Sequence, residues 1–440
     1  MSLPRYDSYK DSGVEWLGDV PSHWSPEKLK YIATFSGGGT PSRENLDYWN
    51  GGIPWVSPKD MKAPLISETE ETITDQGLLS SAASLVPPGA VLMVVRSGIL
   101  RHTIPLSENV CEVALNQDMK AIRFSDISTA RFFRYWVSGF NGKLIFVWSK
   151  QGATVESIEH SYLSGTVIPL PAPLERQAIV SFLDKETAKI DALIAAQERL
   201  IELLKEKRQA VISHAVTKGL DPSVPMKDSG VEWIGEIPAH WRVVPLRSLF
   251  SFVKRQDGEE LEVLSVYRDY GVIPKSSRDD NNNVTPEDLS KYQKVRVGDL
   301  VVNKMKAWQG SLGISKYDGI TSPDYAVFKP IHRGLSSFLH LLLRCELMPD
   351  VYRLISNGIR PSQWRLEPDK FKELKVPLPP LPEQQAISEL VNDQARRYET
   401  LATSARQAIS LLQERRAALI SAAVTGKIDV RSLIDTSEAA

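Results

Sequence analysis

The sequence predicts an α+β protein: two globular domains separated by two long helices that form an antiparallel coiled coil, with a pseudo-two-fold internal repeat. Three observations predict this fold. A block near the start of the chain returns about 217 residues later, and a second block near the end of each half also returns. Each second block is followed by about 40 residues with helical hydrophobic periodicity. A repeat of this length indicates a duplicated half-protein rather than a solenoid.

The repeated blocks flank two inserts that differ. Residues 10–24 and 227–241 are identical at 11 of 15 positions, and both end in His-Trp. The second block begins with Pro-Leu-Pro at 169–171 and 377–379 and continues into Glu-x-Gln-Ala-Ile. Between the blocks, the two halves share almost no sequence. We therefore expect the repeated blocks to be scaffold and the unlike inserts to carry the function.

The long helices are expected to start at Pro173 and Pro382. From there to Thr217 and Thr425 the chain has no further proline or glycine, and at about 1.5 Å per residue each helix is roughly 60 Å long. An apolar stripe of this length needs a partner, which favours a coiled coil; burial in two separate domains is the alternative. The predicted packing residues are Ile190, Ile194, Ile201, Leu204, Tyr398, Leu401, Ile409 and Leu412.

These signals predict the domain organisation. A first globular domain is expected at residues 1–168, followed by a helix at 169–220. A second globular domain is expected at 221–376, and a second helix with a C-terminal tail at 377–440.

Composition narrows the function classes. The net charge is −1 over 440 residues, which argues against binding nucleic acid by bulk electrostatics. The charge is unevenly distributed, because residues 1–170 carry −3 and residues 227–375 carry +3. No apolar run approaches the roughly 18 residues that span a bilayer, and the N-terminus lacks signal-peptide features, which predicts a cytoplasmic location. Cys111 and Cys345 have no neighbours that suggest a metal site, so no metal ligands are predicted.

The first insert contains polar, cationic and glycine-rich segments suited to DNA contact. Glycines let backbone amides approach a phosphate, and Asn or Gln amides suit adenine edges, whereas a simple glycine-rich hairpin is the competing interpretation. The candidate DNA-binding residues are Gly38, Gly39, Thr40, Ser42, Arg43, Trp55, Ser57, Lys59, Arg96, Arg101, Asn116, Gln117, Lys150 and Gln151.

The second insert offers different residues for the same role. It combines lysines suited to phosphates with amides suited to base edges, whereas packing of cations on aromatic rings is the competing interpretation. The candidates are Lys254, Arg255, Arg268, Asn303, Lys304, Lys306, Trp308, Gln309, Arg360, Gln363, Trp364 and Arg365.

Together these motifs resemble the specificity subunits of type I restriction-modification systems, over nearly the whole chain. The resemblance rests on the order and duplication of five motifs. They are Gly-x-Thr-Pro at 38–41, Asn-Gln-Asp-Met at 116–119, Trp-Ile-Gly-Glu-Ile-Pro-x-His-Trp at 233–241, Asn-Lys-Met-x-Ala-Trp-x-Gly at 303–310 and Pro-Leu-Pro-Pro-x-x-Glu-Gln-x-x-Ile at 377–387.

The resemblance implies a non-catalytic subunit. Each of two target-recognition domains would read one half of a bipartite site in double-stranded DNA, and the paired helices would act as a ruler. Two modification subunits would bind S-adenosylmethionine and methylate adenine, and two restriction subunits would use ATP and Mg²⁺. No cofactor and no catalytic residue is then expected on this chain.

Two alternatives remain from the residues alone. Asp350, Glu373 and Lys375 fit the loose Pro-Asp, Glu-x-Lys pattern of Mg²⁺-dependent nucleases. A coiled-coil scaffold without DNA contacts is the other alternative.

Overall fold

The computed structural model describes residues 4–150, 155–278, 285–358 and 364–433. The chain forms two compact units: unit 1 comprises Met1–Gln197 and Gln407–Ala440, and unit 2 comprises Glu198–Arg406. The long helices are α6 (Pro173–Lys218) and α10 (Leu381–Val424). The first part of α6 and the last part of α10 belong to unit 1, and the remainder of each helix belongs to unit 2. In the described ranges, no helix combines the length and apolar character needed to cross a membrane.

Both long helices begin and end at the signals that the sequence carries. Proline occupies the first turn of each, at Pro173 and Pro382, where its missing N–H costs no hydrogen bond. Gly219 and Gly426 follow close behind the helix ends with φ of +82° and +68°, the left-handed conformation that terminates a helix. The predicted pair of long helices is confirmed.

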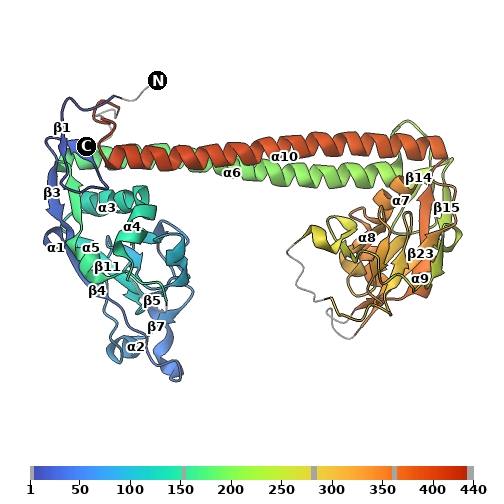
Figure 1. Ribbon diagram of the computed structural model, residues 1–440, viewed down its shortest axis with the longest axis horizontal. Helices are drawn as coiled ribbons and strands as arrows, with labels where there is room; N and C mark the ends of the chain where they lie inside the picture. Colours follow the sequence, from blue (N-terminus) through green and yellow to red (C-terminus); the bar gives the residue numbers. More distant parts are fainter. Residues whose placement is uncertain (1–3, 151–154, 279–284, 359–363, 434–440) are drawn as a thin grey trace. The chain divides into compact units, whose positions relative to one another are not determined.

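The two helices run antiparallel within each unit, side by side as Figure 1 shows. In unit 1, Arg416 Nε donates to Asp191 Oδ1 at 2.9 Å, and Val424 of α10 shares a core with Ile179 of α6. In unit 2, Val216 near the end of α6 shares a core with residues near the start of α10. These contacts confirm the predicted antiparallel coiled coil.

The seam between the helices follows the predicted stripe closely but not completely. Ile190 and Leu204 are buried, and Ile194, Ile201, Tyr398, Ile409 and Leu412 are half-buried. Leu401 departs from the stripe with 51% exposure, whereas Ala402 and Ala405 beside it are buried. The inward face of α10 therefore carries small side chains at this level.

The core of unit 1 is a five-stranded sheet. Its strands, in spatial order, are β4 (Ala33–Gly37), β11 (Met119–Phe124), β8 (Val91–Val94), β9 (Leu106–Asn109) and β6 (Leu65–Ile66). The central strand β8 is buried at all four positions. A smaller sheet joins β10 (Ala114–Leu115), β5 (Trp49–Val56) and β7 (Thr72–Ile73). The helices are α1 (Leu29–Ile32), α2 (Asp75–Leu79), α3 (Ile127–Gly139), α4 (Asn141–Trp148) and α5 (His160–Gly165), and α3 packs on the main sheet.

Unit 2 contains a sheet whose strand order matches four of the five strands of the unit 1 sheet. Its four antiparallel strands are, in order, β16 (Phe250–Val253), β23 (Tyr325–Pro330), β20 (Leu300–Asn303) and β21 (Leu312–Ile314). They match β4, β11, β8 and β9 of unit 1 in order and direction. Two-stranded pairs join β17 (Leu264–Tyr267) to β18 (Gly271–Pro274), β19 (Gln293–Val295) to β22 (Gly319–Thr321) and β24 (Ser356–Asn357) to β25 (Arg365–Leu366). The helices are α7 (Ser336–Leu343), α8 (Met348–Leu354) and α9 (Pro368–Glu373). Two inserts without recognisable sequence similarity thus share one sheet topology.

The repeated blocks attach each insert to the start of a long helix. In unit 1, β1 (Tyr9–Asp11) pairs with β2 (Asp19–Pro21) and β3 (Ser25–Lys28) pairs with β12 (Val167–Leu170). In unit 2, β13 (Met226–Asp228) pairs with β14 (Glu236–Pro238) and β15 (Arg242–Pro245) pairs with β26 (Lys375–Leu378).

The histidine of each block fixes the helix start through the same contact. His23 Nε2 lies 2.8 Å from Glu175 Oε2, and His240 Nε2 lies 2.8 Å from Glu383 Oε2. Trp24 adds an indole N–H that donates to Glu175 Oε1 at 3.0 Å. The histidine and glutamate that occur in both copies therefore hold each repeated block against the start of its long helix.

A half-buried histidine makes the stability of unit 2 sensitive to acid. His340 on α7 accepts a hydrogen bond from the Ile314 amide at its Nδ1, at 3.1 Å. Burial, helped by the nearby cations Arg344 and Lys316, lowers the pKa of His340 to about 4. The folded protein therefore keeps this imidazole neutral at pH values where an unfolded chain protonates it.

We expect the melting temperature to fall as the pH falls from about 6.5 to about 4, because the unfolded state takes up a proton that the folded state refuses. The loss approaches about 3 kcal/mol at the lower end of this window. In His340→Asn, whose side-chain oxygen still accepts from Ile314, this part of the pH dependence should vanish. Melting curves measured from pH 7 to pH 4 test this, and an unchanged slope in the variant contradicts it.

Candidate nucleic-acid interface

Three cations meet at one end of the main sheet of unit 2. Lys254 follows β16, Lys304 follows β20 and Arg365 is the first residue of β25. The amide of Leu366 in β25 donates to Lys304 O at 2.9 Å, which holds the two segments together. The pKa of Lys304 lies below its ordinary value because burial disfavours the charge and because Arg365 and Lys254 lie close to it, although the nearby Asp324 opposes the shift. Among the described residues, no carboxylate forms an ion pair with any of the three. We call these residues the unit 2 cation cluster.

Aromatic rings and amides border the unit 2 cation cluster. Trp308, on the short helix η5 (Ala307–Gln309), meets Trp364 edge to face, with ring centroids 5.3 Å apart. Lys306 and Gln309 on either side of Trp308 are exposed, and Arg268 is exposed near Gly310. Exposed cations suit phosphates, and amides beside them suit base edges. The structure thus brings these predicted residues together.

Two of the predicted residues in unit 2 make internal contacts instead. Arg255 Nη2 donates to the buried Asp299 Oδ2 at 2.6 Å. Burial raises the pKa of Asp299 above its ordinary value, although Arg255 and backbone N–H groups oppose that shift. Asn303 is buried, and its Oδ1 accepts from the Met305 amide at 3.1 Å. These contacts favour structural roles for both residues.

In unit 1, the glycine-rich loop packs against its own chain. A Cβ added to Gly38 would lie 2.2 Å from the carbonyl oxygens of Leu115 and Asn116, and one added to Gly39 would lie 2.6 Å from the Ala83 amide nitrogen. Glycine is needed here for close packing of the backbone, which favours the hairpin interpretation over an approach to phosphate.

Three more predicted residues of unit 1 are buried in this packing. Trp55 is 2% exposed and donates through Nε1 to Gly39 O at 3.0 Å. Ser57 donates through its hydroxyl to Asp60 Oδ2 at 2.8 Å, and Asn116 Oδ1 accepts from the Asp118 amide at 2.9 Å. These contacts also favour structural roles.

Arg43 is held by partners on three sides. Its guanidinium carbon lies 3.9 Å from the centroid of the Trp49 ring and 5.2 Å from that of Trp55, and both terminal nitrogens donate to the Glu71 carboxylate. This contact lowers the pKa of Glu71 below its ordinary value. Glu71 was not among the sequence candidates, since no local pattern links it to Arg43; the pairing of β5 with β7 brings the two segments together.

The remaining candidates of unit 1 are accessible to different degrees. Arg101 pairs with Glu156 at 2.5 Å, and Lys150 lies 3.9 Å from Glu159. Thr40 is half-buried, whereas Ser42, Lys59, Arg96 and Gln117 are exposed. Gln151, Arg360 and Gln363 lie outside the described residues.

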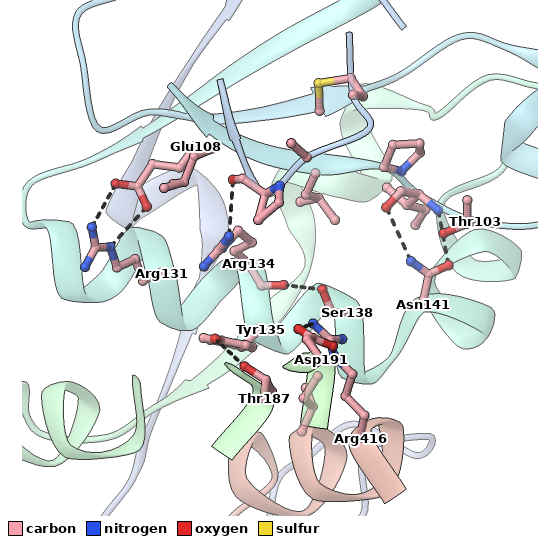
Figure 2. A pocket seen from close by; sticks show the side chains of 18 of the residues that line it. Thr103, Glu108, Arg131, Arg134, Tyr135, Ser138, Asn141, Thr187, Asp191 and Arg416 are labelled. Atoms are coloured by element: carbon pink, nitrogen blue, oxygen red, sulfur yellow. Dashed lines mark hydrogen bonds and ion pairs between the residues drawn. The ribbon is translucent and has the colours of Figure 1, made fainter. Parts of the chain in front are cut away.

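Unit 1 also contains a cleft of about 770 Å³ between α3, the two long helices and the segment around Pro64 (Figure 2). Its charged side chains engage groups of the protein itself: Arg131 donates to Glu108, Arg416 to Asp191 and Arg134 to Pro64 O. Tyr135 donates to Asp184 at 2.5 Å, and burial raises the pKa of Tyr135 to about 12. Its paired charges make this cleft a poorer match for a polyanion than the unit 2 cation cluster.

The carboxylates of the nuclease pattern lie in separate ion pairs. Asp350 lies 3.4 Å from Arg353 on α8, and Glu373 accepts from Arg247 at 2.5 and 2.7 Å. Within the described part of the chain, no group of three or more His, Cys, Asp or Glu residues is arranged to hold a metal ion. The geometry therefore does not favour a shared Mg²⁺ site.

The family model for the type I restriction modification DNA specificity domain matches the chain twice, at residues 21–203 and 238–405. The chain belongs to this family. The two matches cover most of both halves, so the duplication seen in the sequence corresponds to two copies of the family's domain. The motifs that suggested the resemblance lie within or beside the matched ranges.

Relatives in the DNA specificity family include subunits from bacteria and archaea. The chain is 33% identical over 201 residues to the EcoR124I/EcoR124II specificity subunit of Escherichia coli, covering 46% of this chain and 47% of that protein. It is 26% identical over 268 residues to the MjaIX specificity subunit of Methanocaldococcus jannaschii, covering 59% and 58%. The chain thus matches about half the length of these relatives.

Solved structures of the family share the fold. A chain from a study of complex assembly and conformational transition of the type I R-M system has a TM-score of 0.63 at 14% identity and covers 92% of this chain and 98% of its own. The HsdS subunit from Thermoanaerobacter tengcongensis has a TM-score of 0.50 at 14% identity and covers 93% and 98%. At this identity the likeness establishes the fold alone.

Proposed function

We propose that this chain is the DNA sequence-specificity subunit of a type I restriction-modification complex. Each globular domain would read one half of a bipartite site in double-stranded DNA. The observation that carries the proposal is the unit 2 cation cluster, in which three cations have no ion pair with any described residue, on a domain of the DNA specificity family. A sheet end with exposed cations, amides and aromatic rings suits the phosphate backbone and the base edges beside it.

The chemistry of the complex would lie on partner subunits. Two modification subunits would bind S-adenosylmethionine and methylate adenine, and two restriction subunits would use ATP and Mg²⁺ to move and cut DNA. The recognition domains would occupy residues 1–168 and 221–376, and the helical segments at 169–220 and 377–440 would set the spacing between half-sites. Because such a complex would act on cellular DNA, it would lie in the cytoplasm.

Exchanging the first insert tests the proposal. When residues 25–165 are replaced by the corresponding segment of another family member, we expect one half of the methylated sequence to change and the other half to persist. The measurement is a map of methylated adenines in host DNA from long-read sequencing. A change in both halves contradicts modular reading.

The insert exchange and one point variant separate the alternatives. A coiled-coil scaffold without DNA contacts predicts that the methylated sequence does not change after the exchange. A nuclease that uses Asp350 and Glu373 predicts that Asp350→Ala abolishes restriction, whereas the proposed function predicts that restriction and methylation both continue.

A further inference from the structure

Unit 2 carries a short hairpin whose backbone is firmly held. Strands β17 and β18 pair with Tyr267 opposite Gly271, which leaves three residues, 268–270, between them. We call these three residues the hairpin tip. Gly271 has a φ of +75°, the left-handed conformation that closes a three-residue hairpin loop. A Cβ added there would lie 3.1 Å from His340 Cε1, so glycine is needed at this position and fixes the shape of the tip.

The guanidinium of Arg344 holds the hairpin tip from inside. Its Nη2 donates to Arg268 O, and its Nη1 donates to Tyr267 O at 3.4 Å and to Leu312 O. Leu312 is the first residue of β21, so Arg344 ties the tip to the main sheet of unit 2. The cation is half-buried, and three carbonyl oxygens satisfy its donors. The backbone of the tip is therefore fixed, while all three of its side chains remain exposed.

The hairpin tip borders the candidate interface. A Cβ added to Gly310 would lie 4.0 Å from Cγ of Arg268, and Gly310 directly follows η5, which carries Trp308. Trp308 in turn meets Trp364, the neighbour of Arg365 in the unit 2 cation cluster. Arg268 lies outside all five motifs that carry the family resemblance. It belongs to the unlike part of the insert, where residues that differ between members must lie.

The chemistry of the hairpin tip suits a base edge better than a phosphate. No described residue forms a hydrogen bond or an ion pair with the guanidinium of Arg268. Asp269 beside it is exposed, and its carboxylate would repel the phosphate backbone, for which the unit 2 cation cluster is available. The major groove of DNA is wide enough to admit a two-stranded ribbon such as β17 and β18.

We propose that Arg268, positioned by Arg344, recognises a guanine in the half-site read by unit 2. The inference rests on the proposed function and names one base contact within it. A guanidinium has donors only, in a rigid fork, so it selects two neighbouring acceptors. Guanine alone presents such a pair, N7 and O6, in the major groove. Adenine offers one acceptor beside a donor, thymine offers one acceptor beside a methyl group, and cytosine offers a donor.

The first test compares methylation maps of the complex containing the wild-type chain or Arg268→Lys, which keeps the charge and removes the fork. In the wild type, we expect a guanine at one position of the half-site that persists when residues 25–165 are exchanged. In the variant, the preference for guanine should fall by about 10-fold or more at that position alone. Arg333→Lys is the matched control, because Arg333 is also exposed but follows the opposite end of β23, and it should leave the map unchanged.

The second test loosens the hairpin tip from inside. In Arg344→Lys, one ammonium replaces a guanidinium that holds three carbonyl oxygens. We expect the guanine preference to relax at the same position, while the other positions of the site keep theirs. The melting temperature, measured alongside, reports any loss of stability. Equal loss of methylation at every site, without a change of base preference, would contradict a positioning role for Arg344.

Three results overturn the base contact itself, and they depend on Arg268→Lys, a change at the surface, even where Arg344→Lys does not fold. If the map is unchanged in Arg268→Lys, Arg268 does not read a base, and a smaller salt slope in Arg268→Gln would assign it to a phosphate instead. A base other than guanine at the affected position contradicts the match to the fork. The absence of any bipartite methylation site in the wild type would overturn the proposed function and this inference together, whereas the first two results leave the proposed function intact.

Discussion

Replacing Lys254, Lys304 and Arg365 by glutamine is expected to lower the affinity of the assembled complex for its DNA by about 100-fold at physiological salt. Each cation that contacts a phosphate releases a counterion, so the slope of log affinity against log salt should shrink by about 2.7 for three contacts. Burial and two neighbouring cations already lower the pKa of Lys304. A phosphate placed there would relieve that repulsion, which is why we expect a large effect.

The matched control removes the same charge from unit 2 elsewhere. Arg353, Lys370 and Lys372 each pair with a carboxylate, namely Asp350, Glu367 and Asp369. Their glutamine variants should change the salt slope little. Titrations of labelled DNA at several salt concentrations measure both effects. Equal slopes for the two triple variants would show that the unit 2 cation cluster does not contact phosphates.

Arg255→Met is expected to destabilise unit 2 by about 3–5 kcal/mol, because it leaves the carboxylate of Asp299 buried without its cation. The double variant Arg255→Met, Asp299→Leu removes both charges and should recover much of this loss. Denaturant unfolding of the three proteins measures the free energies.

The Arg255 prediction also decides between a structural role and DNA contact. If Arg255→Met leaves the free energy of unfolding unchanged and weakens DNA binding, Arg255 is a contact residue after all. If the free energy of unfolding falls and the folded fraction binds DNA with a normal salt slope, the role of Arg255 is structural, through its ion pair with Asp299.

The local signals of the chain predicted the scaffold well. Helix periodicity, the prolines at the helix starts and the absence of further proline or glycine up to Thr217 and Thr425 are properties of short segments, so they could be recognised without tertiary information. Leu401 shows the limit of prediction from periodicity. The apolar stripe predicted a buried leucine, but Ala402 and Ala405 occupy the inward face of α10 at this level. The exact rotation of a helix depends on its partner.

The candidate site was harder to predict because residue type does not determine accessibility. Glycines at 38 and 39, Trp55 and Asn116 have the composition of a binding loop, yet they are packed against their own chain. Arg43 and Arg255 are both engaged with carboxylates, whereas Lys254 and Arg365 form no ion pair within the described part of the chain. The nuclease pattern around Asp350 matched by residue type alone, because Asp350 lies in an ion pair with Arg353 instead of a shared metal site.

The sequence by itself determined the duplication, the two long helices and the family, because repeats, periodicity and motif order are readable along the chain. Only the tertiary structure decided that the unlike inserts share a sheet topology, and which of the candidate cations have partners. The reason is physical: Glu71 lies 28 residues from Arg43 and Asp299 lies 44 residues from Arg255, and only the fold brings these pairs within hydrogen-bonding distance. The same holds for Thr40 and Gln117, 77 residues apart, whose side chains are hydrogen-bonded to each other.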